Sequence, residues 1–258
     1  MLEKNIIIFT DLDGTLLDHN TYSFEAALPM LDFIKKQKIP LIIVTSKTKS
    51  EVIHIQKLLG LKTPFIVENG AGIFIPKEGE YEMIPLGCDY QEVRSAFVRY
   101  AKHIAMRGFF DMNIGEISEY TGLDAKSAAD AKARSFSEPF VLEDEKALSK
   151  LLKMAEKDGL DVVKGGRFYH LITKGQDKAK AMNTLVARYE KEKGCSFKTV
   201  ALGDSPNDLT MLKNVDTPIL IPRPDGSYMP CDIAHISQAP FPGAKGWNTA
   251  MKEYFNVQ

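Results

Sequence analysis

One short segment near the start of the chain constrains the fold more than any other. The apolar run Ile6–Thr10 is followed at once by Asp11-Leu12-Asp13-Gly14-Thr15. A run of this length and character predicts a strand that is buried on both faces, as in a parallel sheet. Catalytic groups gather at the carboxyl ends of such strands, where the chain leaves the sheet. The sequence therefore predicts an α/β protein with two carboxylates at one edge of its sheet.

The spacing of Asp11 and Asp13 points to chemistry. Two carboxylates held side by side repel each other, so they need a cation between them, different protonation states, or both. A magnesium-dependent phosphoryl-transfer site has these requirements, because one carboxylate attacks phosphorus and the other handles the proton of the leaving group. The alternative is a solvated turn that closes the strand, since D-x-D-G also occurs in calcium loops.

Two further apolar runs end in polar residues in the same way. Residues 41–44 lead into Thr45, and residues 199–202 lead into an acidic loop, while a lysine begins a predicted helix between them. Each residue also has an ordinary structural explanation: the threonine as a helix N-cap, the lysine as a surface residue, the acids as caps of a turn. The further candidates are Thr45, Lys178, Asp204, Asn207 and Asp208.

The order of predicted elements indicates two domains. Strands alternate with helices at 24–37, 50–59 and 178–191, which predicts right-handed crossovers and a doubly wound parallel sheet. Residues 85–173 follow a different, α+β order, with helices at 90–106, around Ile117, at 125–134 and at 145–157, and strands at 139–142, 161–163 and 167–172. We therefore expect a core domain of residues 1–84 and 174–258, with an inserted domain of residues 85–173.

Composition limits the classes of partner. A formal net charge of −1 gives no general field that would attract nucleic acid or anionic lipid, so local cations must hold any anionic substrate. The sequence has no apolar stretch of membrane-spanning length and no room for a signal peptide before the first strand. Its three cysteines lack C-x-x-C spacing and predict reduced thiols without a zinc site. We expect a cytoplasmic protein with a small-molecule substrate, and neither nucleic acid nor membrane as a partner.

The four motifs, in this order and each at its predicted strand end or helix start, resemble those of the haloacid dehalogenase superfamily of phosphatases. The resemblance implies that Asp11 is the nucleophile that forms a phosphoaspartate and that Asp13 is the general acid and then the general base. Thr45 would bind a phosphoryl oxygen, and Lys178 would neutralise charge. The inserted domain would be a cap of type C2B, which closes over the active site and selects the substrate.

A metal site is expected at the same sheet edge. Carboxylate oxygens with no nearby His or Cys favour Mg²⁺ over zinc. The resemblance implies that the ligands are the carboxylates of Asp11 and Asp204 and the main-chain carbonyl of Asp13. Asp208 would support these ligands, and Asn207 would hold a water on the metal.

Three segments suggest the substrate. Residues 45–48, 64–70 and 165–170 resemble those of mannosyl-3-phosphoglycerate phosphatases, in which the cap contacts the sugar and the glycerate carboxylate. Asn69-Gly70 could instead be only a hairpin turn, Arg134 a helix C-terminal cation, and His170 a structural histidine. The predicted substrate-binding residues are Lys47, Glu68, Asn69, Gly70, Arg134, Arg167 and His170.

Other functions remain open from the sequence. One hydroxyl separates mannose from glucose, so glucosyl-3-phosphoglycerate, or another sugar phosphate such as trehalose or sucrose phosphate, is an alternative substrate. A phosphomutase would use the same pair of aspartates. A binding protein without catalysis is the third alternative, against which the intact motifs count.

Overall fold

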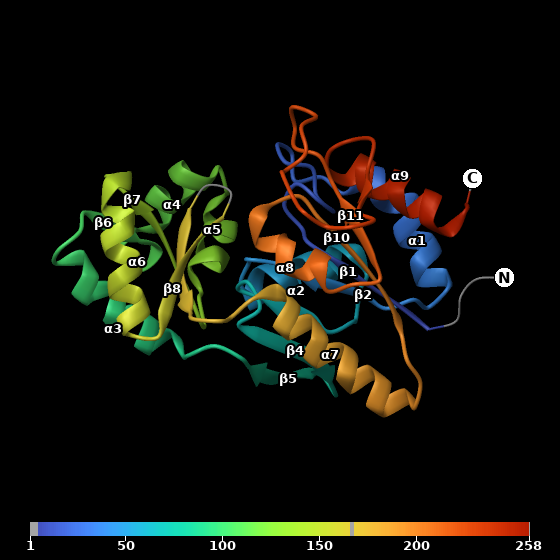
Figure 1. Ribbon diagram of the computed structural model, residues 1–258, viewed down its shortest axis with the longest axis horizontal. Coiled ribbons are helices and arrows are strands. Elements are labelled where there is room, and N and C mark those ends of the chain that lie inside the picture. The colour runs from blue at the N-terminus through green and yellow to red at the C-terminus, as the bar shows by residue number, and fades with distance from the viewer. Residues whose placement is uncertain (1–4, 166–167, 258) are drawn as a thin grey trace. The chain divides into compact units, whose positions relative to one another are not determined.

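The computed structural model describes residues 5–165 and 168–257, and these fold into two compact units (Figure 1). The first unit comprises Met1–Thr45, Thr63–Ile66 and Lys178–Gln258. The second comprises Ser46–Lys62 and Val67–Asp177. The inserted domain predicted at 85–173 falls inside the second unit, which also contains segments that the sequence analysis assigned to the core.

A parallel sheet forms the centre of the first unit. All five residues of its strand β1 are buried, as the apolar run predicts, and β1 pairs with β10 so that Ile6 lies opposite Lys198. The predicted α/β fold class with a parallel sheet is therefore confirmed. In spatial order the strands are β12 (Ser237–Gln238), β11 (Thr217–Leu220), β10 (Lys198–Gly203), β1 (Ile6–Thr10), β2 (Leu41–Val44) and β3 (Phe65–Val67).

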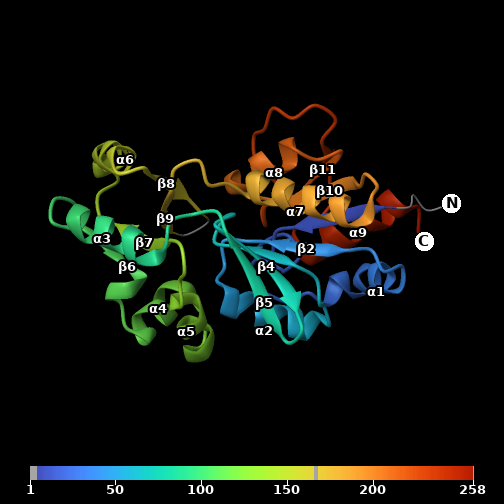
Figure 2. The same ribbon diagram turned by 90° about the horizontal axis from the view of Figure 1, so that it is seen from below.

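Helices cover the two faces of this sheet. Helix α1 packs against α9, and α7 packs against α8, on opposite sides of the strands (Figure 2). This is the doubly wound arrangement that the alternation of elements predicts, although α8, α9, β11 and β12 were not anticipated individually. The elements are η1 (Glu25–Ala27), α1 (Leu28–Lys36), α7 (Lys178–Lys193), η4 (Pro206–Asp208), α8 (Leu209–Lys213) and α9 (Gly243–Phe255).

The second unit contains an antiparallel sheet in the order β6 (Met106–Gly108), β7 (Glu138–Leu142), β9 (Tyr169–Thr173) and β8 (Leu160–Lys164). Successive residues of a strand point to opposite faces. Phe140 accordingly packs with α3 and α6, whereas Val141 packs with α4 and α5. The helical elements are α3 (Tyr90–Ala101), η2 (Phe109–Asp111), α4 (Ile114–Thr121), α5 (Ala125–Lys132), η3 (Glu145–Ala147) and α6 (Leu148–Lys157).

A helix and a hairpin complete the second unit: α2 (Lys49–Leu59), β4 (Gly72–Lys77) and β5 (Glu80–Pro85). The hairpin turns at Glu78 and Gly79, both with positive φ (44° and 92°), as a tight turn between antiparallel strands requires. Strand β5 was not predicted. The helix predicted over 90–106 is wrong at its end: it stops at Ala101, because Met106 pairs with Leu142 of β7 and extends the sheet.

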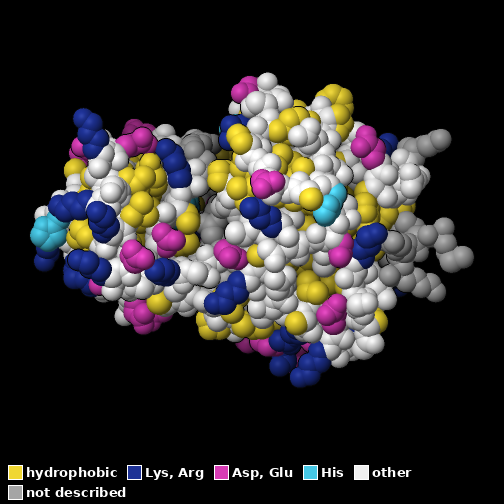
Figure 3. Space-filling model, in the orientation of Figure 1, with side chains coloured by type: hydrophobic (Ala, Val, Ile, Leu, Met, Phe, Trp, Pro, Cys, Tyr) yellow, Lys and Arg dark blue, Asp and Glu magenta, His cyan; other side chains and the backbone are white. Residues whose placement is uncertain are grey.

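The face of the molecule drawn in Figure 3 carries charged side chains of both signs among hydrophobic ones. Figure 3 shows Lys and Arg side chains interspersed with Asp and Glu side chains on the visible face. Among the helices of the described residues, none has both the length and the apolar character needed to cross a bilayer.

Candidate active site

Asp11 follows β1 directly, at the carboxyl end of a central strand. Its backbone N–H donates to the carbonyl of Leu202 in β10 at 3.0 Å, and its side chain is buried. The hydroxyl of Thr10 donates to the carbonyl of Asp11 at 2.7 Å, and the indole N–H of Trp247 donates to that hydroxyl at 3.1 Å. The backbone that carries the carboxylate is thus fixed from two directions. Neither Thr10 nor Trp247 was identified from the sequence, because their roles depend on α9 packing under the sheet.

Lys178 is the first residue of α7 and is almost completely buried. Its Nζ atom lies 2.6 Å from Oδ1 of Asp11 and 2.6 Å from Oδ1 of Asp208. Burial alone would lower the pKa of Lys178, but the two carboxylates outweigh it, so the pKa is raised and the lysine stays charged. This burial excludes the alternative of a surface lysine.

Three carboxylates converge beside Lys178. Asp11, Asp204 and Asp208 each offer an oxygen, and these oxygens all lie within 4.8 Å of one another. Burial, reinforced by the neighbouring acids and opposed by Lys178, raises the pKa of Asp11 well above its usual range. Burial and then the charge of Asp208 raise the pKa of Asp204 to about 7. A bound cation would offset this repulsion, and a set of oxygen donors fits a hard divalent ion.

The loop after β10 is held by one of these acids. Oδ2 of Asp208 accepts from the backbone N–H groups of Asp204 (3.1 Å) and Ser205 (3.0 Å), so Asp208 caps the turn while its other oxygen binds the lysine. Asp204 accepts a hydrogen bond from the Thr15 hydroxyl at 3.1 Å. Gly14 has φ 76°, and a Cβ there would lie 2.7 Å from Oδ2 of Asp204. Only glycine therefore lets the first loop approach the acidic one.

Thr45 follows β2 and donates its backbone N–H to the carbonyl of Ile66 at 3.1 Å. The N-cap of α2 is Thr48, whose hydroxyl accepts from the backbone N–H of Glu51 at 3.2 Å. The alternative that Thr45 is only a helix cap is therefore wrong. Its side chain is buried at the carboxyl edge of the sheet.

The two remaining predicted residues of this cluster lie in its loops. Asp13 is close enough for its charge to raise the pKa values of Asp11 and Asp204. Asn207 accepts a hydrogen bond from the hydroxyl of Ser205 in the acidic loop. All seven predicted catalytic and metal residues thus belong to the first unit.

The predicted substrate-binding residues belong to the second unit, and two of them form an ion pair. Nε of Arg134 lies 3.4 Å from Oε2 of Glu68, and both side chains are buried. Burial and then the charge of Arg134 lower the pKa of His170 to about 3. Nδ1 of His170 has no hydrogen-bond partner among the described atoms, and a Cβ at Gly165 would lie 3.0 Å from its Nε2. His170 is therefore a neutral imidazole in a confined space.

The remaining predicted substrate-binding positions are Lys47, Asn69, Gly70 and Arg167. Lys47 forms an ion pair with Glu51 at 3.7 Å. Asn69 and Gly70 have positive φ (60° and 92°), which the Asn-Gly sequence permits, and Asn69 is buried. Arg167 lies outside the described residues.

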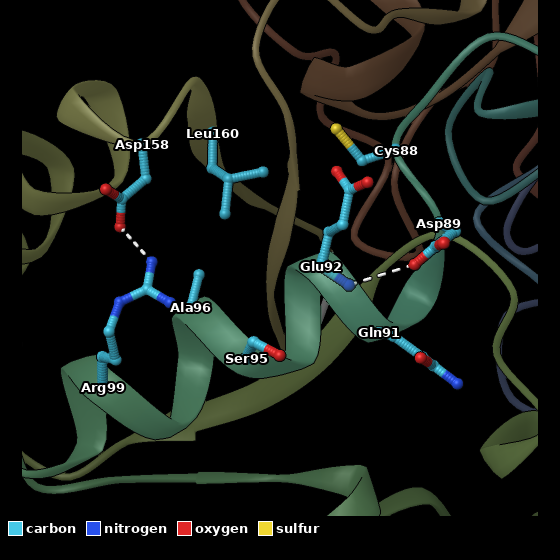
Figure 4. A pocket seen from close by; sticks show the side chains of 9 residues that line it. All are labelled: Cys88, Asp89, Gln91, Glu92, Ser95, Ala96, Arg99, Asp158 and Leu160. Atoms are coloured by element: carbon cyan, nitrogen blue, oxygen red, sulfur yellow. Dashed lines mark hydrogen bonds and ion pairs between the residues drawn. The ribbon is translucent and has the colours of Figure 1, made fainter.

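A pocket of about 510 Å³ lies beside α3 in the second unit (Figure 4). Two hydrogen bonds join residues of its lining: Arg99 donates to Asp158 at 2.7 Å, and the backbone N–H of Glu92 donates to Asp89 at 3.0 Å. None of the predicted site residues lines it. Its lining consists of Cys88, Asp89, Gln91, Glu92, Ser95, Ala96, Arg99, Asp158 and Leu160.

Comparison with known proteins decides the family. The model of the haloacid dehalogenase-like hydrolase family matches residues 8–103 and 113–221. The chain belongs to the haloacid dehalogenase-like hydrolases. This confirms the resemblance carried by the four motifs.

This hydrolase also has curated relatives of the same length. It is 48% identical over 262 residues to the glucosyl-3-phosphoglycerate/mannosyl-3-phosphoglycerate phosphatase of Persephonella marina, covering 97% of each chain. It is 43% identical over 263 residues to the phosphatase of the same name from Methanococcoides burtonii, covering 96% of each.

Solved structures share the fold at low identity. The protein 0175 of Thermoplasma acidophilum matches 99% of this chain and 100% of its own, with a TM-score of 0.73 and 17% identity. The haloacid dehalogenase subclass IIB sugar phosphatase BT4131 matches 96% of this chain and 98% of its own, with a TM-score of 0.69 and 16% identity. At this level of identity, the likeness to these structures shows the fold alone.

Proposed function

We propose that this hydrolase is a magnesium-dependent phosphatase that converts mannosyl-3-phosphoglycerate or glucosyl-3-phosphoglycerate to the glycosylglycerate and inorganic phosphate. The observation that carries the proposal is the buried contact of Lys178 with Asp11 and Asp208, beside a third carboxylate. The substrate class is supported by the activities named for two relatives that match almost the whole chain.

The proposed reaction proceeds through Asp11. Its carboxylate attacks phosphorus in line and forms an aspartyl phosphate, while Asp13 protonates the departing glycerate oxygen. Asp13 then takes a proton from water, which cleaves the aspartyl phosphate and releases phosphate. Lys178 opposes the protonation of Asp11 and would stabilise the charge that develops on the phosphoryl oxygens, to which Thr45 would donate a hydrogen bond.

The proposed cofactor is Mg²⁺. Asp11, Asp204 and the main-chain carbonyl of Asp13 would hold it, with Asp208 and Asn207 as supporting groups. When bound, the ion would supply positive charge that offsets the repulsion among the carboxylates and the phosphoryl group. Lys178 is a further cation at this site, in direct contact with Asp11 and Asp208.

The second unit supplies the proposed recognition groups. Arg167 is our candidate for the glycerate carboxylate, because a guanidinium binds a carboxylate in a bidentate fashion. Arg134 is a second candidate. Neutral His170, together with Lys47, Asn69 and Gly70, would bind sugar hydroxyls. The three cysteines are free thiols, and we place this activity in the cytoplasm.

Phosphate release from a panel of esters tests the proposal. The panel contains both glycosyl-3-phosphoglycerates, trehalose and sucrose phosphates, and p-nitrophenyl phosphate, each with magnesium. We expect the two glycosyl-3-phosphoglycerates to have the highest kcat/KM, and D11N to release no phosphate from any ester. A tenfold preference for a sugar phosphate without glycerate would overturn the substrate assignment. Transfer of the phosphoryl group without release of phosphate would indicate a mutase.

A further inference from the structure

Glu68 is a buried carboxylate whose oxygens are both used by the protein. Oε1 accepts from the backbone N–H of Ser135 at 2.8 Å. Oε2 accepts from the backbone N–H of Phe136 at 3.1 Å and from the hydroxyl of Ser137 at 2.7 Å, and it pairs with Arg134 at 3.4 Å. The side chain has no exposed surface. A sugar hydroxyl would therefore have to displace a protein donor in order to bind this carboxylate.

Arg134 is held by the same group of residues. Its Nη2 donates to the carbonyl of Ser46 at 3.0 Å and to the hydroxyl of Ser137 at 2.7 Å, while Nε faces Glu68. Only 3% of its side chain is exposed. A guanidinium has five N–H groups in a fixed fork, and among the described residues these contacts engage Nη2 and Nε, which leaves the two N–H donors of Nη1 for a ligand.

The backbone at Glu68 is strained and is fixed at both of its own polar groups. Its φ is 50°, in the left-handed region that a residue with a side chain rarely adopts. The N–H of Glu68 donates to the carbonyl of Lys47 at 3.0 Å, and Nε2 of Gln176 donates to the carbonyl of Glu68 at 2.7 Å. Strain of this kind persists only where the surroundings determine the conformation. The backbone therefore holds the side chain of Glu68 in one position.

We infer that Glu68 is a positioning residue that holds the Arg134 guanidinium ready for the substrate, and that it does not bind the substrate itself. A buried guanidinium needs a paired carboxylate, because an uncompensated charge inside a protein is costly. The substrate is itself anionic, so a carboxylate in contact with it would add repulsion, whereas a carboxylate behind the arginine fixes the orientation of a cation. The inference rests on the proposed function and reassigns Glu68, which the sequence predicts as a substrate ligand.

A double-mutant cycle between Glu68 and Arg134 tests the inference. The assay measures kcat/KM for a glycosyl-3-phosphoglycerate and for p-nitrophenyl phosphate, which is too small to need Arg134. We expect E68Q to lower kcat/KM for the large substrate about 10- to 100-fold and for the small ester by less than about threefold. R134M should show the same pattern. In the R134M background, E68Q should add less than about a threefold loss, because there is no guanidinium left to position.

Two further variants separate positioning from folding. E68D keeps the charge and should retain more selectivity than E68Q. E116Q makes the same chemical change at a glutamate of this unit that pairs with Arg107 at 2.6 Å, and should leave the ratio of the two substrates unchanged. If E68Q does not fold, the variant carrying both E68Q and R134M buries no lone guanidinium and should match R134M.

Equal losses on both substrates, or losses that multiply in the double variant, would overturn the inference. Failure of the proposed function is detected separately, on the wild-type protein. If the wild type prefers another sugar phosphate of the panel, the cycle is run on that ester, and the same two outcomes decide the role of Glu68.

Discussion

Replacing His170 by glutamine should change how the stability of the second unit depends on pH. The unfolded chain protonates this imidazole near pH 6.5, whereas the folded chain, in which burial and Arg134 disfavour the charge, protonates it only near pH 3. A depressed pKa gives stability that is present above the unfolded pKa and is lost as the pH falls. Between about pH 3 and pH 6.5, unfolding is therefore accompanied by the uptake of one proton at His170.

The size of the effect follows from this linkage. One proton taken up on unfolding lowers the free energy of unfolding by about 1.4 kcal/mol for each unit of pH. Between pH 6.5 and pH 5.0 the wild-type protein should lose about 2 kcal/mol through His170 alone. H170Q has no group to protonate, so its stability relative to the wild type should rise by about 2 kcal/mol over the same interval.

Urea unfolding at several pH values, with a chelator present throughout, measures this difference. Far-UV circular dichroism is the suitable signal, because the single tryptophan, Trp247, lies in the first unit and does not report on His170. H103Q is the matched control: His103 is exposed on the same unit, and its removal should leave the pH profile parallel to that of the wild type. Parallel profiles for H170Q and the wild type, within about 0.5 kcal/mol, would refute the argument that this histidine is buried and neutral.

Three further predictions concern the reaction. D11N should fold normally but lose several orders of magnitude in kcat, because the amide is nearly isosteric but not nucleophilic; near-normal turnover would exclude Asp11 as the nucleophile. Activity should require a divalent cation, with magnesium effective and calcium poor because of its longer ligand distances, and full activity after thorough chelation would remove the metal assignment. R167A should lower kcat/KM for a glycosyl-3-phosphoglycerate roughly 30- to 1,000-fold, which corresponds to a loss of about 2–4 kcal/mol of transition-state stabilisation, with little change for p-nitrophenyl phosphate. An equal loss on both substrates would indicate that Arg167 supports the fold or the phosphoryl site.

The sequence predicts the centre of the first unit well, because short apolar runs between helical patterns indicate buried parallel strands. The run at 6–10 is a buried strand. Asp11 at its end contacts Lys178, which lies 167 residues further along the chain, and Lys178 also contacts Asp208. Parallel strands place their carboxyl ends at one edge, so the meeting follows from the topology.

Other features could not be predicted because they depend on tertiary contacts. Strand β6 is short, and the helical pattern of the residues before it continues into it. Only the pairing of β6 with β7 distinguishes it as a strand. The ion pair of Glu68 and Arg134 joins side chains 66 residues apart whose individual patterns indicate a turn and a helix end. The hydrogen bond from Trp247 to Thr10 likewise arises only after α9 packs under the sheet. The sequence motifs predicted a set of residues that the structure brings together at one sheet edge, but not the residues that hold them in place.

The position of β1 at the centre of its sheet has a consequence for synthesis on the ribosome. Its partner β10 begins at Lys198, so one edge of β1 stays unpaired until almost 200 residues have followed it. At a translation rate of about 5–20 residues per second this delay is roughly 10–40 seconds, during which an apolar strand edge is exposed to aggregation or to chaperones. Lys178 and Asp208 also emerge late, so the buried contacts that join Asp11 to Lys178 and Lys178 to Asp208 form only after most of the chain has been synthesised.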